Sequence, residues 1–160
     1  MTGDELRHAM GHFATGVTVV TSLDDDRGPV GTTASAVSSL SLDPALLLVC
    51  LTRDSETLRA LRSHGRFAVN VLAAEQRELS ARFARSGELA SWDGVRFEPG
   101  STGVPRLGGV LTTLECTLEE LLAGGDHEIV VGRVREVAVS DGTLEPLLHW
   151  RGDYARLGAG

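Results

Sequence analysis

The sequence predicts one mainly β domain with short helices, in which the strands pack around a single core as a closed or nearly closed barrel. Three observations support this prediction. The chain has 160 residues, the length of one domain, which we place over residues 1–160. Its 42% hydrophobic and 23% charged residues make a globular composition, able to bury a core. Many β-type runs are separated by Gly, Pro and Asp turns, whereas helical patterns are few and short.

The first part of the chain alternates one short helix with β-rich runs. Gly and Pro in an acidic segment break the first strand. An unbroken apolar run over 46–53 predicts a strand buried on both faces. Before it we expect a helix over 4–12, a strand over 13–23, a turn over 24–29, and a strand from Val30 to the Asp43-Pro44 pair.

Capping signals define the next helix and the turns that follow. Asp54 or Ser55 can cap a helix over 55–62, and Gly65 can end it. Helix-prone residues at 118–122 leave the type of one later element open. We expect a strand over 66–72, a helix over 75–86, an irregular segment over 87–106 that is a candidate flap or dimer contact, and strands over 111–125, 127–141 and 147–157.

Charge and motif content exclude several classes of function. The net charge is −7 and arginines are dispersed among carboxylates, which argues against nucleic-acid binding. No segment approaches the roughly 18 unbroken apolar residues of a membrane span, and the N-terminus lacks a signal-peptide pattern, so we expect a cytoplasmic protein without membrane contact. No nucleophile elbow, Walker motif, Rossmann fingerprint or metalloprotease signature is present, which removes the hydrolases and nucleotide folds that carry those motifs.

Cysteines and histidines give no metal-site spacing. Cys50 and Cys116 each lie inside an apolar run, so we expect buried free thiols rather than a disulfide or a metal pair. His8 and His12 are one helical turn apart without a further ligand nearby, which indicates a helix face.

Three segments contain polar groups that can bind a ligand. The small residues 31–39, GTTASAVSS, allow a flat ligand close to the backbone, or else form a strand packed under a helix or at a dimer seam. Residues 53–57, RDSET, run from a strand into a helix N-terminus, which suits a phosphate but also an ordinary cap. Residues 125–127, GDH, hold a histidine at a strand start, where it can face a ligand or belong to a plain turn.

The chain resembles the short-chain flavin reductase family from about Leu6 to Leu157, in the order of the segments FATGVTVVT, GTTASAVSSLSLDPALLLVCL, FAVNVLAAEQRELSARFA, GVPRLGGVLTTLECTLEE, GDHEIVVGRV and PLLHWRGDYARL. These proteins are the NAD(P)H:flavin oxidoreductase components of two-component flavin-dependent monooxygenases. The resemblance implies an FMN-binding split β-barrel of Greek-key type that works as a homodimer. It implies binding of FMN or FAD, hydride transfer from NADH or NADPH, and delivery of reduced flavin to a monooxygenase partner.

The resemblance also implies roles for individual residues. The flavin-binding positions would be Thr33, Ala34, Ser35, Ala36, Ser39, Arg53, Ser55, Thr57, Asn70 and Phe83. The nicotinamide side would be Thr15, Gly16, Gly125, Asp126, His127, Arg151, Gly152, Asp153 and Tyr154. His127 would be the catalytic residue, with an orienting and electrostatic role rather than that of an obligatory general acid, because the flavin supplies the redox chemistry. Ser35 replaces the Asn or Thr of other members, and Asp153 stands where a basic residue is often found.

Two alternatives to the reductase remain, because a fold does not fix a function. One is a flavoprotein of the same barrel that holds FMN as a carrier or store without turnover. The other is an oxidase acting on its own small substrate, which no sequence feature supports. The GDH motif favours the reductase, while FMN against FAD and NADH against NADPH stay open.

Overall fold

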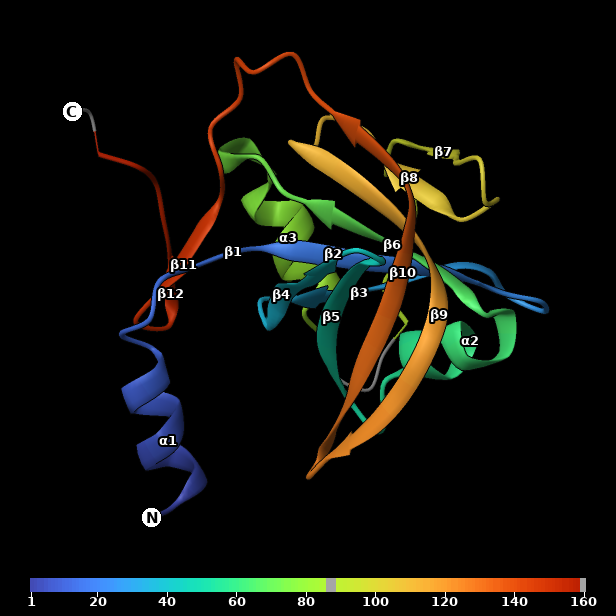
Figure 1. Cartoon of the computed structure of the whole chain (residues 1–160). Coiled ribbons are helices and arrows are strands. Elements are labelled where there is room, and N and C mark those ends of the chain that lie inside the picture. The colour runs from blue at the N-terminus through green and yellow to red at the C-terminus, as the bar shows by residue number, and fades with distance from the viewer. Residues whose placement is uncertain (86–88, 159–160) are drawn as a thin grey trace.

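A seven-stranded antiparallel sheet forms the body of the molecule in the computed structural model, which describes residues 1–85 and 89–158 (Figure 1). The strands run in the order β3-β2-β6-β9-β10-β5-β4. They are β2 (Thr18–Asp24), β3 (Gly28–Ala34), β4 (Val37–Leu42), β5 (Ala45–Thr52), β6 (Arg66–Val71), β9 (Thr112–Gly124) and β10 (His127–Val139). The two edge strands, β3 and β4, are joined by only two residues, so the sheet curls until its edges meet there. The mainly β class with short helices is confirmed.

The segment from Val30 to Asp43-Pro44 is two strands, so the prediction of a single strand was wrong. β3 pairs with β2, whereas β4 pairs with β5. The chain changes partners at Ser35 and Ala36, and the Ala36 carbonyl already accepts a hydrogen bond from the Cys50 amide at 2.9 Å. No Gly or Pro marks this junction, because the residues are small enough to turn without one.

The β9–β10 hairpin is the longest paired unit of the sheet. Its turn contains only Gly125 and Asp126, because His127 pairs directly with Gly124. Gly125 has φ 75°, in the left-handed region that favours glycine. The helix-prone residues 118–122 lie in β9, where pairing with β10 outweighs their helix propensity.

The predicted helices are present with shifted ends. They are α1 (Gly3–Met10), α2 (Glu56–His64), a 3₁₀ turn η1 (Ala74–Gln76) and α3 (Arg77–Phe83). Ser55 caps α2 by accepting a hydrogen bond from the Leu58 amide, and Gly65 ends it at φ 72°. The end of the helix predicted over 75–86 and the start of the irregular segment fall partly on residues 86–88, outside the described residues. None of the helices in the described ranges is long and apolar enough to cross a bilayer.

Two predicted strands are interrupted in the structure. The segment over 13–23 forms two strands, β1 (Thr15–Gly16) and β2. Val17 separates them, because its backbone hydrogen bonds go to Leu147 and Leu72 and not to the partners of either strand. The run over 147–157 is a hairpin of β11 (Leu148–Trp150) and β12 (Asp153–Ala155). Together β1, β11 and β12 make a small separate sheet, and β7 (Phe97–Pro99) pairs with β8 (Pro105–Leu107) in the segment predicted to be irregular.

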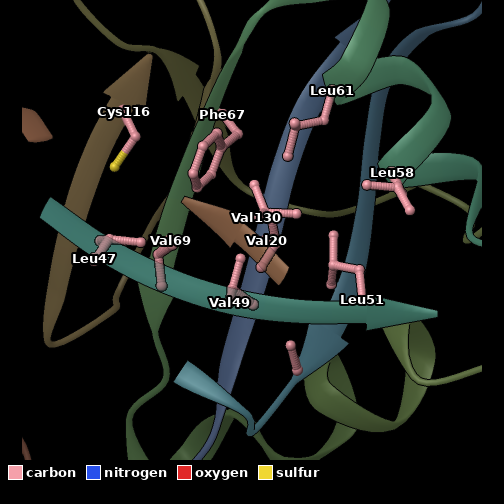
Figure 2. Packing of buried hydrophobic residues seen from close by; sticks show 11 residues of the cluster. Val20, Leu47, Val49, Leu51, Leu58, Leu61, Phe67, Val69, Cys116 and Val130 are labelled. Atoms are coloured by element: carbon pink, nitrogen blue, oxygen red, sulfur yellow. The ribbon is translucent and has the colours of Figure 1, made fainter. Parts of the chain in front are cut away.

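The main core lies inside the curled sheet (Figure 2). Phe67 and Val69 of β6 face Val49 of β5, and α2 closes the cluster with Leu58 and Leu61. A second cluster holds α3 against β2 through Phe83, which is 1% exposed. Because the two clusters bury apolar side chains of α2 and α3, they fix the positions of these helices on the sheet.

β5 is buried on one face only, so the prediction of burial on both faces was wrong. Leu47, Val49 and Leu51 point into the core. The alternate residues Leu46 and Leu48, with Cys50, are half-buried on the outer face. The outer face is therefore apolar without being covered by the described part of the chain.

Candidate functional site

An open cleft of about 260 Å³ lies where the two edges of the curled sheet meet. It brings together the small-residue segment, the end of β5, the N-terminus of α2 and the start of β10. The lining residues are Gly31, Thr32, Thr33, Ala34, Ser35, Ala36, Cys50, Leu51, Thr52, Asp54, Ser55, Glu56, Thr57, Ala84, Arg85, Leu89 and His127. All three ligand-binding segments predicted from the sequence thus contribute to one cleft.

The small-residue segment forms one wall of the cleft and also rests on α3. A Cβ atom on Gly31 would lie 3.0 Å from Cε1 of Phe83, so only glycine fits there without a shift. The Thr33 hydroxyl donates a hydrogen bond to the Ser80 carbonyl at 2.7 Å, which ties β3 to α3. The segment is packed against a helix, as one interpretation expected, and it also lines the cleft, while its binding of a flat ligand stays a prediction.

The N-terminus of α2 forms a second wall. Ser55 is its cap, and Thr57 is 2% exposed at the cleft surface. Glu56 also lines the cleft, but its carboxylate is paired with Arg27 at 2.8 Å and with Arg59. The helix therefore presents backbone amides and hydroxyls to the cleft, which suits a phosphate group.

Arg85 supplies positive charge to the cleft, and sequence reasoning missed it. It follows α3 and is the sole arginine among the described lining residues. Arg53, predicted for this role, is not among them; its backbone amide donates to the Asp126 carbonyl at 3.1 Å. No sequence signal separates Arg85 from the other surface arginines, since its place depends on how α3 packs.

His127 is the first residue of β10 and pairs with Thr52 of β5, which holds its backbone at the cleft edge. Its Nδ1 atom lies 2.7 Å from Oδ1 of Asp126. That hydrogen bond and the charge of His127, followed by the charge of Arg53, hold the pKa of Asp126 below its usual value. Because a carboxylate only accepts, we assign the proton to Nδ1, which leaves Nε2 for a ligand.

Asn70 lies outside the cleft and is fully buried. Its amide nitrogen donates to the Val19 carbonyl at 3.0 Å and to the Thr21 hydroxyl at 3.1 Å. Its oxygen accepts from the Leu107 amide at 3.0 Å and the Thr113 hydroxyl at 3.1 Å. With every polar group bonded, the side chain joins β2, β8 and β9 around β6.

Two other predicted flavin positions also lie apart from the cleft lining. Phe83 is buried beneath Gly31 and packs edge-on against Trp92 at 5.1 Å between ring centroids. Ser39 is exposed on β4, opposite Leu47 of β5. Phe83 supports the cleft only indirectly, by packing beneath Gly31 of β3. Ser39 has no contact with the cleft lining.

The remaining predicted nicotinamide positions form a separate group at β1 and the β11–β12 hairpin (Figure 1). Thr15 and Gly16 pair with β11, and Arg151 and Gly152 form the hairpin tip at φ 52° and 81°. The Asp153 carboxylate forms an ion pair with the Arg77 guanidinium, with 3.2 Å between Oδ1 and Nη2. The Tyr154 hydroxyl lies 2.8 Å from the Ser80 hydroxyl on α3. None of these residues lines the His127 cleft within the described chain.

The chemistry of the cleft suits a flat ligand that bears a phosphate. Small side chains at Gly31, Ala34 and Ala36 leave room for a ring against the backbone. Amides at the α2 N-terminus and the guanidinium of Arg85 suit the phosphate. The residues present therefore fit a flavin, whose flat ring and phosphate need these two surroundings.

Comparisons with known proteins agree on one family. Residues 10–158 match the model of the flavin reductase like domain. The chain is 46% identical over 156 residues to the flavin reductase (NADH) of Kitasatospora aureofaciens, covering 96% of this chain and 81% of that protein. It is 40% identical over 149 residues to HsaB, the reductase subunit of a flavin-dependent monooxygenase of Mycobacterium tuberculosis, with 92% and 79% covered. The NADH:FAD oxidoreductase SgcE6 of Streptomyces globisporus superposes with a TM-score of 0.90 at 34% identity, over 98% of this chain and 93% of that one.

Proposed function

The chain belongs to the flavin reductase family and is an NAD(P)H:flavin oxidoreductase, and we propose that its flavin lies in the cleft beside the 31–36 segment with the nicotinamide next to His127. It supplies reduced flavin to a partner monooxygenase. The observation that supports this placement best is the convergence of the small-residue wall, the α2 N-terminus and His127 on one cleft.

The protein residues bind and position the reactants. When bound, the flavin supplies the redox chemistry by accepting a hydride from the nicotinamide. The 31–36 segment holds the flat ring, while Ser55, Thr57 and Arg85 hold the phosphate. His127 orients the nicotinamide through Nε2, and Asp126 fixes the imidazole. Holding two rings in reactive contact can supply much of the rate, so no protein acid or nucleophile is needed.

Two apolar surfaces support a homodimer, which we propose as the working state. The first is the outer face of β5 with the neighbouring edge strand β4. Leu46 and Leu48 of β5 are half-buried on the outer face, and the β4 residues opposite them are Ser41 and Ser38. On β4 itself Leu40 and Leu42 are 48% and 91% exposed. Large apolar side chains that are left exposed at a sheet edge suit an interface between subunits.

The second surface is one side of α1. This helix stands away from the curled sheet, and none of its residues is buried (Figure 1). Leu6 and Met10 lie one helical turn apart on α1 and are 49% and 56% exposed, and Phe13, just after the helix, is 68% exposed. An eight-residue helix is marginal in water without packing, so a second copy of the chain would stabilise it.

Loss of absorbance at 340 nm tests the activity. The purified protein should oxidise NADH or NADPH when FMN, FAD or riboflavin is added. If no pair of nicotinamide and flavin gives oxidation above background, the result would favour the alternative of a flavoprotein that carries FMN without turnover. His127→Ala should slow flavin reduction in stopped-flow experiments or raise the KM for NAD(P)H. Unchanged reduction kinetics in that variant would remove His127 from the site.

A further inference from the structure

Helix α3 contacts both the wall of the cleft and the small sheet of β1, β11 and β12. The base of the β11–β12 hairpin is held by the main sheet, where the Leu147 backbone bonds to Val17 and Leu72. Farther along the hairpin, Asp153 and Tyr154 of β12 bond to side chains of α3. The same helix holds β3, which lines the cleft. It therefore links two sheets that share no strand pairing within the described ranges.

Ser80 is the residue of α3 that bonds to both β3 and the hairpin. Its backbone carbonyl accepts the hydrogen bond from the Thr33 hydroxyl of β3 at 2.7 Å. Its side-chain hydroxyl lies 2.8 Å from the Tyr154 hydroxyl of β12, and the two share a hydrogen bond. Ser80 is 0% exposed, so the loss of either partner leaves a buried polar group without a hydrogen bond. One buried residue thus joins the cleft wall to the C-terminal hairpin.

Phe83 provides a second contact through which a shift of α3 reaches the cleft. It lies one helical turn after Ser80 and packs beneath Gly31, where a Cβ atom would be 3.0 Å from the phenyl ring. Because protein interiors are close-packed, a displacement of α3 also displaces the stretch of β3 over 31–33. These residues line the cleft, so the position of α3 sets the shape of the cleft wall.

The other contacts between α3 and the hairpin lie at the surface. The Arg77 guanidinium is 5.1 Å from the centre of the Tyr154 ring and forms an ion pair with Asp153. Both charged side chains of this pair are well exposed, and ion pairs of that kind contribute little to stability. The buried bond between Ser80 and Tyr154 is therefore the main polar tie between α3 and the hairpin.

We propose that Ser80 is a positioning residue through which the C-terminal hairpin sets the affinity of the cleft for flavin. The inference rests on the proposed placement of the flavin beside β3. Ser80 and Tyr154 are not among the described residues that line the cleft, so their effect on the flavin passes through β3. The family resemblance implies instead that Tyr154 contacts the nicotinamide. The two roles predict different kinetics, because one acts on flavin binding and the other on NAD(P)H.

Flavin binding to two variants that remove the same hydrogen bond tests the proposal. Dissociation constants for riboflavin, FMN and FAD are measured by flavin fluorescence for the wild type, Ser80→Ala, Tyr154→Phe and the double variant. Each single change should weaken the binding of all three flavins about three- to tenfold, because all three carry the ring that we place against β3. The double variant should bind no more weakly than either single variant, since the three variants lack one and the same bond.

Ser22→Ala is the matched control for the loss of a buried hydroxyl. Ser22 is 0% exposed on β2, donates to the Arg66 carbonyl at 2.7 Å and is not among the described residues that line the cleft. This change should lower the melting temperature, measured by circular dichroism, and leave the flavin dissociation constants unchanged. If Ser80→Ala also lowers the melting temperature alone, with wild-type flavin binding, its role is only structural and the proposal is overturned.

Hydrogen–deuterium exchange of the hairpin gives a second readout, because coupling between two sites is reciprocal. Saturating riboflavin should slow amide exchange over residues 148–155 of the wild type, although none of them is among the described lining residues of the cleft. In Ser80→Ala, at a riboflavin concentration that still saturates the protein, this protection should be lost. Protection that persists in Ser80→Ala would mean that the hairpin responds to flavin without Ser80, and would overturn the proposal.

The remaining outcomes separate this inference from the proposed function. Unchanged flavin binding in Tyr154→Phe, together with a raised KM for NAD(P)H at saturating flavin, would assign Tyr154 to the nicotinamide and overturn the inference. Additive losses of flavin affinity in the double variant would show that Ser80 and Tyr154 act separately, which overturns it as well. Both results leave the proposed function standing. Failure of the wild type to bind any flavin, riboflavin included, would instead overturn the proposed function and the inference with it.

Discussion

The Nδ1 atom of His127 lies 2.7 Å from Oδ1 of Asp126, so two consecutive residues at the β9–β10 turn form one hydrogen-bonded unit. The hydrogen bond and the charge of His127 lower the pKa of Asp126, which keeps its carboxylate ready to accept. His127 is fixed by β10, while the Asp126 side chain is 92% exposed. Asp126 is therefore a positioning residue, which acts through the imidazole.

Asp126→Ala should raise the KM for NAD(P)H by about 2- to 10-fold, because the imidazole of His127 loses the hydrogen bond that orients it. Steady-state kinetics with saturating flavin measure the effect. Asp126→Asn keeps an acceptor oxygen and should recover most of the affinity, while Asp25→Ala, in the β2–β3 turn, controls for loss of a surface charge. A wild-type KM for Asp126→Ala would show that the imidazole needs no partner.

Glu115 is a buried carboxylate that holds the segment before β8. It is 1% exposed and accepts from the Thr102 amide at 2.9 Å and its hydroxyl at 2.7 Å, with longer bonds from Ser101. Arg106 lies 3.6 Å away. Burial raises the pKa of Glu115, but the hydrogen bonds from Thr102 and Ser101 outweigh it, so the net pKa is lowered from 4.5.

Glu115→Gln should lower the free energy of unfolding at neutral pH by about 1–3 kcal/mol, because a charged acceptor is lost. A lowered folded-state pKa stabilises the protein above the unfolded pKa, and this gain disappears as pH falls through the folded value. The gap between wild type and variant should therefore shrink below about pH 4.5 in denaturation curves. Glu120→Gln, exposed on β9, is the control. A gap that stays constant down to the acid limit would contradict this role.

Local signals in the sequence were sufficient for the elements with regular periodicity or clear caps. Ser55 and Gly65 define α2, and the apolar run defines β5. The partner change at Ser35 and Ala36 was not predictable, because strand pairing depends on residues far along the chain. The strand expected over 111–125 is present despite the helix-prone residues at 118–122, because the ladder with β10 decides the structure there.

Only those parts of the candidate site that consist of contiguous residues were predicted from the sequence. The GDH turn and the small-residue strand could be found because their chemistry is contiguous in sequence. Arg85 could not, since its approach to the cleft depends on the packing of α3. Asn70 lies in a strand that resembles the family, but its buried hydrogen bonds join three elements that no local pattern connects.

Gly132 is required by close packing at an irregularity of β10. A Cβ atom there would lie 2.4 Å from Cζ of Phe67 and 3.0 Å from Cβ of Cys116. Gly132→Ala should lower the free energy of unfolding by about 1–3 kcal/mol through overpacking, measured by urea denaturation. Phe67→Leu in the same chain should restore part of the loss relative to the sum of the single changes. Strict additivity of the two substitutions would contradict the contact, and Gly158→Ala, with open space around it, is the control.

The two cysteines should differ in reactivity. Cys116 is fully buried, and burial followed by the charge of Glu115 raises its pKa to about 12. Cys50 is half-buried and lines the cleft. In the native protein, an aromatic disulfide reagent should label the Cys50 thiol quickly. It should label the Cys116 thiol only after unfolding.

Bound flavin extends this test to the location of the ligand. Saturating FMN or FAD should slow the labelling of Cys50, because the ligand covers the cleft. Cys50→Ser should abolish the fast phase, while Cys116→Ser should leave it intact. Labelling of Cys50 at the same rate with and without bound flavin would place the flavin elsewhere.

Met10→Asp tests whether α1 packs on a second copy of the chain. Met10 is central in the exposed apolar row of Leu6, Met10 and Phe13. Burial of one such side chain contributes about 1.5–3 kcal/mol, so a charge there should raise the dimer dissociation constant about 10- to 100-fold. Sedimentation equilibrium measures this constant. Leu144→Asp changes a 37% exposed leucine outside both apolar surfaces and should sediment like the wild type. A Met10→Asp protein with the wild-type dissociation constant would show that α1 lies outside the interface, and the outer face of β5 and β4 would then remain as the surface through which the chains meet.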